Sequence, residues 1–132
     1  MESIEKIKHL VNLAAADGEV TEAEKQFIIN IGQANHMLVP EILPLFSSSH
    51  PMIDFTGLTD DQKFDYVLLL MQLMKIDAKL YRQEILYCAK IIAKLGYREQ
   101  VIFELLEKVS PDMTKSEIDN LRKITATYLR RP

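Results

Sequence analysis

The chain has few residues that make turns: it contains four glycines, five prolines and no tryptophan among 132 residues. An all-β sandwich needs a turn about every ten residues, so this scarcity argues against that class. Hydrophobic residues make up 48% and charged residues 27%, a globular mixture that excludes a disordered chain. Length and composition together predict one mostly helical domain spanning residues 1–132.

Cysteine occurs once, at Cys88, which excludes an intramolecular disulfide and a Cys-x-x-Cys zinc pair. The apolar neighbours within Ile85–Ala89 predict that Cys88 is a buried free thiol. Long apolar runs are also missing, because the densest, Tyr66–Met74, is interrupted by Gln72 and is about half the length that spans a bilayer. The first residues do not have the pattern of a secretory signal. We therefore expect a cytoplasmic protein without a membrane span.

Net charge is −3, which provides no general attraction to nucleic acid. The charge is unevenly distributed: residues 1–66 contain four Lys and Arg against eleven Asp and Glu, and residues 67–132 contain twelve against eight. We expect no nucleic-acid partner. A role as a nucleic-acid accessory protein stays open as an alternative because the second half is positive and the last helix has a basic end, formed by Arg122, Lys123, Arg130 and Arg131.

Apolar residues recur at helical spacing in about seven segments, which predicts an all-α fold. Capping boxes, in which Thr is followed three residues later by Glu or Gln, open three helices at Thr21, Thr59 and Thr114. Tyr66–Met71 is apolar on every face, so its helix is expected at the buried centre. The expected helices run from Ser3 to the turn Asp17-Gly18 and over about 22–35, 41–46, 60–77, 82–95, 98–109 and 115–129.

The chain resembles itself when it is shifted by sixty residues. Leu13–Asp17 falls on Leu73–Asp77, and Glu24 falls on Glu84. This pattern predicts two pseudo-symmetric helix-turn-helix repeats, at about 3–35 and 60–97, packed around a central buried helix. The remaining parts of the single domain are an insert at 36–58, which contains three prolines, and the C-terminal helices at 98–130.

Four carboxylates lie within eight residues at the first helix-turn-helix: Asp17, Glu19, Glu22 and Glu24. Hard divalent cations such as Ca²⁺ and Mg²⁺ bind several oxygen ligands of this kind. A self-contained EF-hand is excluded, because Leu13 and Ala15 stand where two more oxygen ligands are needed.

Two interpretations of the acidic turn stay open. If the repeats pack about a pseudo-twofold axis, four acids converge into a composite cation site, namely Asp17, Glu24, Asp77 and Glu84. Alternatively the residues are structural, with Glu24 accepting a hydrogen bond from the Thr21 amide. The second repeat has Ala78-Lys79 where the first has Gly18-Glu19, so it lacks one carboxylate.

The segment Leu13–Glu24, with its Ala-Asp-Gly turn, an aliphatic residue and a Glu opening the next helix, resembles the TerB-like family, named for tellurite resistance. The resemblance implies a fold of about seven helices with internal pseudo-symmetry. It also implies a non-enzymatic module linked to stress and chemical resistance in bacteria. Metal binding through acidic residues is the family's suspected property, and it would fall here on Asp17, Glu19, Glu24, Asp77 and Glu84.

Other residue patterns support alternative functions. The same acids would serve a carboxylate-dependent metal hydrolase if they surrounded one metal with open ligand positions.

The histidines His9, His36 and His50 are far apart in sequence, and we expect His9 to be solvated and none to be catalytic. We expect the apolar pairs Met37-Leu38 and Leu45-Phe46 to pack in the core. The alternative is an exposed ledge for a protein partner or a second subunit.

Overall fold

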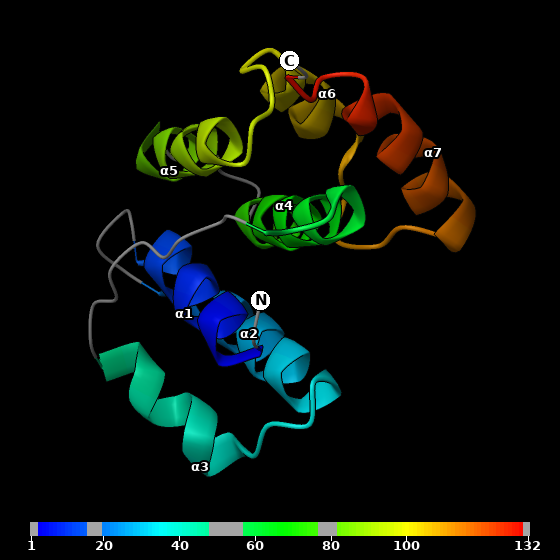
Figure 1. Ribbon diagram of the computed structural model, residues 1–132. Coiled ribbons are helices and arrows are strands. Elements are labelled where there is room, and N and C mark those ends of the chain that lie inside the picture. The colour runs from blue at the N-terminus through cyan, green and yellow to red at the C-terminus, as the bar shows by residue number, and fades with distance from the viewer. Residues whose placement is uncertain (1–2, 16–19, 48–56, 77–81, 131–132) are drawn as a thin grey trace.

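The computed structural model of the chain describes residues 3–15, 20–47, 57–76 and 82–130. Helices are the regular structure in these residues, and the predicted all-α class with about seven helices is confirmed (Figure 1). In chain order the elements are α1 (Ser3–Ala14), α2 (Glu22–Ala34), α3 (Val39–Ile42), the 3₁₀ helix η1 (Leu43–Ser47), α4 (Asp60–Met74), α5 (Arg82–Lys94), α6 (Val101–Lys108) and α7 (Lys115–Ala126).

All three predicted capping boxes form. In α2 the Glu24 amide donates to Thr21 Oγ1 at 3.2 Å, and the Thr21 amide donates to Glu24 Oε1 at 3.1 Å. The same reciprocal pair opens α4 and α7, where Thr59 and Thr114 are the capping residues. These bonds satisfy amides that have no partner within the first helical turn, and they fix where each helix begins.

Helix α4 is the centre of the fold, as its apolar sequence predicts. It packs against α1, α5 and α7, and in Figure 1 it lies between α1 and α7. Contact from several directions buries eight of its fifteen residues, which are Phe64, Tyr66, Val67, Leu68, Leu70, Met71, Leu73 and Met74. Burial of large apolar side chains on more than one face accounts for most of the stability that this helix contributes.

Burial repeats along the chain at the sixty-residue spacing seen in the sequence. The core positions of α1 recur in α4, where residues buried in both helices are Ile7 and Val67, Leu10 and Leu70, Val11 and Met71, and Leu13 and Leu73. The second helices agree as well, since Ile28 of α2 and Cys88 of α5 are both fully buried. Helix α1 packs on α2 as α4 packs on α5. These matches support the predicted repeat.

The segment assigned to an insert begins with ordered structure. Helix α3 and η1 occupy its first part, and Ile42 is fully buried in the core. Ile42 also packs on Gly32, where a Cβ atom would lie 2.5 Å from Ile42 Cδ1, so the glycine permits the close approach of α2 and α3. Residues 48–56 lie outside the described part of the chain.

The end of the last helix differs from the prediction. Helix α7 stops at Ala126, and the next residues leave the helix to pair with the turn after α5. The Arg98 amide donates to the Tyr128 carbonyl at 2.7 Å, and the Arg130 amide donates to the Gly96 carbonyl at 2.7 Å. Leu129 is therefore buried as part of an extended tail, which helical spacing alone does not reveal.

Candidate functional site

The two predicted glutamates stand at matching places. Glu24 is the third residue of α2 and Glu84 is the third residue of α5, and their side chains are only 3% and 2% exposed. Helix N-termini favour negative charge through the helix dipole, so both positions suit a carboxylate. The remaining predicted ligands, Asp17, Glu19 and Asp77, lie outside the described residues.

The surroundings of the two glutamates differ. Glu24 closes the capping box with Thr21, so the structural role anticipated for it is present. Glu84 lies close enough to Cys88, one turn later on α5, for its negative charge to act on the thiol. Within the described part of the chain, no three His, Cys, Asp or Glu side chains gather closely enough to hold a metal ion.

A polar cluster of buried and half-buried side chains joins α1, α4 and α5. The His9 ring nitrogen Nδ1 lies 3.3 Å from the Tyr87 hydroxyl, which is a hydrogen bond across seventy-eight positions of sequence. The His9 and Tyr66 rings pack edge to face, with their centroids 5.2 Å apart and their planes at 87°. Asn12 also hydrogen-bonds the Tyr87 side chain. Polar groups thus link the first repeat to the second inside the core.

Burial shifts the acidity of this cluster. Loss of water around the side chain raises the pKa of Tyr87 to about 12, and the hydrogen bond with Asn12 opposes that shift. Burial likewise raises the pKa of the Cys88 thiol to about 12, with a further contribution from the charge of Glu84. Burial is also the main reason that the pKa of Tyr66 is raised. Since thiolate is the reactive form of cysteine, Cys88 is an inert buried thiol, as the sequence predicts.

The expectation that His9 is solvated is wrong, because its side chain is only 1% exposed. The cause is the position of α1, which contacts α2, α4, α5 and η1 and so has little free surface. A usable signal was present in the sequence, since Leu13 follows one turn after His9 on the same side of the helix. His36 is exposed at the end of α2, and His50 lies outside the described residues.

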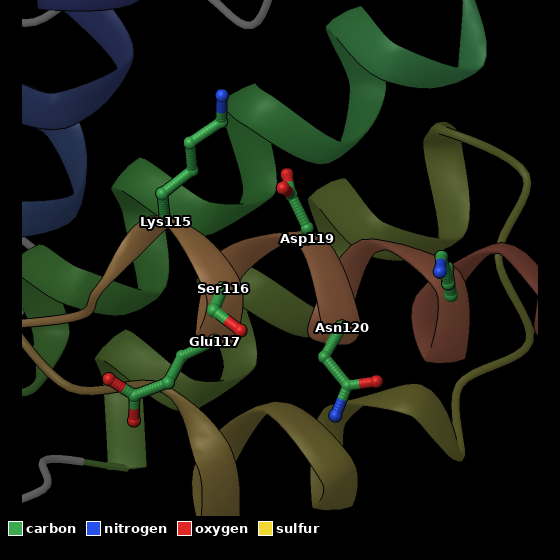
Figure 2. Close-up of a pocket in the computed structure, with 6 residues that line it drawn as sticks. Lys115, Ser116, Glu117, Asp119 and Asn120 are labelled. Carbon is green, nitrogen blue, oxygen red and sulfur yellow. The ribbon is translucent and has the colours of Figure 1, made fainter.

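The surface of α7 carries a shallow hollow, formed entirely by side chains of that one helix. Figure 2 shows Lys115 and Asp119 on one side of the helix and Glu117 and Asn120 on the other. All of these residues are exposed. The side chains diverge from a single helix instead of converging on a point, so the arrangement does not build an enclosed ligand site.

One residue of the basic end of α7, Arg122, pairs with acidic residues of α4 at the surface of the fold. The Arg122 guanidinium reaches Asp61 at 3.2 Å and Asp65 at 3.1 Å, and it lies over the Phe64 ring at 4.6 Å from the centroid. Arg122 therefore links α7 to α4 through two ion pairs and a cation–π contact. Arg131 lies outside the described residues.

The apolar pairs after α2 divide between core and surface. Met37, Leu45 and Phe46 are partly buried and pack against the core, as expected. Leu38 does not, and its side chain is 66% exposed. The reason is that Leu38 caps α3 through its backbone, where its amide donates to Glu41 Oε1 at 3.0 Å and the side chain extends outward.

Comparisons with protein-family models, curated proteins and solved structures found no match to this chain. None of the helices in the described residues combines the length and apolar character needed to cross a membrane.

Proposed function

We propose that this chain is a non-enzymatic helical module of the TerB-like kind, which binds a divalent cation at its acidic helix starts and acts as an interaction protein in a stress or chemical-resistance response. The cations that suit carboxylate oxygens are Ca²⁺, Mg²⁺ and Mn²⁺. The proposed ligands are Asp17, Glu19, Glu24, Asp77 and Glu84.

One observation carries the proposal: Glu24 and Glu84 are both buried at the third position of equivalent helices. Each glutamate also follows an aspartate by seven residues, Asp17 in one repeat and Asp77 in the other. Two acids at two matching helix starts provide the oxygen ligands that a hard cation prefers.

Isothermal titration calorimetry on chelator-treated protein tests the cation. Ca²⁺, Mg²⁺, Mn²⁺ and Zn²⁺ are titrated separately, and we expect saturable heat with at least one of the first three. The double variant Asp17→Asn with Glu24→Gln should lose that heat, because it removes two carboxylates with little change in shape.

The matched control is Glu117→Gln, which changes the same capping position on α7. Glu117 and Glu24 play the same local role at a helix start, so the control separates the loss of a cap from the loss of a cation ligand. Heat that is absent for every cation, or equal in the double variant and wild type, contradicts the proposed cation site.

A further inference from the structure

The outer face of α5 presents a basic stripe, consisting of Arg82, Leu86 and Lys90. These residues follow one another at four-residue spacing, so they lie on one side of the helix in successive turns. All three are exposed, and the Leu86 side chain is 57% accessible to water. Lys94 continues the positive charge along the same helix.

The outer face of α6 presents an acidic stripe, consisting of Glu99, Phe103 and Glu107. Phe103 is 70% exposed, and both glutamates are exposed. Glu99 precedes the helix, but Gln100 has helical backbone angles, and the Ile102 amide donates to the Glu99 carbonyl at 3.1 Å. The helical turn therefore extends back to Glu99, and the three side chains share one side of the helix.

The two stripes match each other in spacing and oppose each other in charge. Each has a large apolar residue at its centre and a charged residue one turn before and one turn after it. The structure contains no ion pair between any of these four charged side chains and another described residue. An exposed apolar residue flanked by charges of one sign suits an interface whose partner carries the opposite sign.

We propose that a second copy of this chain docks here, with the acidic stripe of one copy on the basic stripe of the other. Leu86 would pack against Phe103, Arg82 and Lys90 would pair with the glutamates, and the apolar centre would leave water. An unrelated acidic partner would explain the basic stripe alone, whereas a second copy explains both stripes with one contact. Glu84 lies on the buried side of α5, so the contact does not use this proposed cation ligand.

The contact joins different surfaces of the two copies, since the stripes belong to different helices. After one such contact, one copy still has a free basic stripe and the other a free acidic stripe. These either bind further copies or bind each other, which closes the pair. Wild-type protein should therefore associate in a concentration-dependent manner. Association should weaken when NaCl rises from about 0.05 M to about 0.5 M, because salt screens exposed charges.

Analytical ultracentrifugation of single variants tests the apolar centre. Leu86→Ser and Phe103→Ser should each raise the dissociation constant of the wild-type contact about tenfold or more, because they remove the buried centre of the interface. Mixing the two variants should restore association, since each keeps the stripe that the other has lost. Leu38→Ser is the matched control, because it removes a comparably exposed leucine from the insert at 36–58, outside both stripes, and should change nothing.

Charge reversal tests the pairing of the stripes. Arg82→Glu with Lys90→Glu should weaken association, as should Glu99→Lys with Glu107→Lys, and the variant with all four changes should recover most of it because opposite charges face each other again in either orientation of the stripes. Three results would each overturn the proposal: a wild-type monomer at all concentrations in low salt, equal effects of Leu38→Ser and Leu86→Ser, or a mixture of Leu86→Ser and Phe103→Ser that stays monomeric. Sedimentation reads this contact independently of the calorimetry, so the two proposals fail separately.

Discussion

His36 and Gly96 end equivalent helices with the same left-handed backbone, with φ angles of 66° and 92°. In α2 the Met37 amide donates to the Gly32 carbonyl at 3.0 Å, and in α5 the Tyr97 amide donates to the Ile92 carbonyl at 3.2 Å. The two ends thus close with the same hydrogen bond, sixty positions apart. Glycine accepts this backbone freely, whereas histidine is strained in it.

His36→Gly should therefore stabilise the protein. A left-handed residue other than glycine costs about 1–2 kcal/mol, and the added chain entropy of glycine offsets about 0.5–1 kcal/mol of that gain. We expect the free energy of unfolding to rise by about 0.5–1 kcal/mol. Gly96→Ala should have the opposite effect, a loss of about 1 kcal/mol, because no neighbour obstructs the new Cβ and only the backbone is strained.

Urea unfolding of the two variants measures both changes. A loss of stability in His36→Gly, or no change in Gly96→Ala, would show that the two helix ends are not equivalent.

Alkaline pH should weaken the fold. Burial raises the pKa of Cys88, Tyr87 and Tyr97 to about 12, from ordinary values of 9.0 for the thiol and 10.0 for the phenols. The unfolded chain thus releases these protons first, and it binds fewer protons than the folded chain between about pH 9 and pH 12. The stability that these protonated groups contribute to the folded state is present below about pH 9 and is lost as pH rises toward about pH 12.

Urea midpoints across this pH range test the linkage. Cys88→Ala removes the group with the lowest ordinary pKa, so its stability should begin to fall at a higher pH than that of wild type. An unchanged midpoint up to about pH 11 would be inconsistent with these buried acids.

Arg122→Ala should loosen α7 from α4. The substitution removes contacts to Asp61 and Asp65 and the guanidinium over Phe64. The exposed ion pairs contribute about 0.2–1 kcal/mol each and the cation–π contact about 0.5–1 kcal/mol, so we expect a loss of about 1–2 kcal/mol. Lys123→Ala, an exposed neighbour on the same helix, should change stability by less than about 0.5 kcal/mol.

Thermal unfolding compares the two substitutions directly. Equal melting temperatures for Arg122→Ala and Lys123→Ala would remove the argument that Arg122 fastens the helix.

His9→Ala should destabilise the core. The substitution leaves a space beside Tyr66 and removes the hydrogen bond to the Tyr87 hydroxyl. Replacing a buried ring with a methyl group costs about 2–4 kcal/mol through lost contacts and an unsatisfied polar group. Lys8→Ala, its neighbour on α1, should cost less than about 0.5 kcal/mol. Chemical denaturation of both variants gives the comparison, and equal costs would contradict the burial of His9.

Sequence periodicity predicted the helices because local features determine them. The capping threonines Thr21, Thr59 and Thr114 act within one turn. The burial of most of Tyr66–Met71 follows from its own composition, because the segment is apolar on every face. The tail after α7 could not be predicted in this way. Tyr128 and Arg130 leave the helix for hydrogen bonds to Arg98 and Gly96, in a turn much earlier in the chain, and no local signal marks such a partner.

The positions of two proposed ligands at equivalent helix starts follow from the sequence. Glu24 and Glu84 stand out because helix starts attract acids and because the repeat aligns them. The polar cluster was missed, since burial of His9 depends on the contacts that α1 makes with α4 and α5. Periodicity describes one helix at a time and carries no information about which neighbour covers a polar side chain.

Nuclear magnetic resonance with Mn²⁺ tests the central claim most directly. A cation held at the acidic helix starts broadens nearby amide signals at low Mn²⁺ concentration, because the paramagnetic ion relaxes neighbouring nuclei. We predict that the amides of residues 21–25 and 82–85 broaden first, whereas those at the acidic start of α4, residues 60–62, stay sharp. Broadening that begins at residues 60–62, or that is uniform over the chain, would contradict a cation site at the paired starts of α2 and α5.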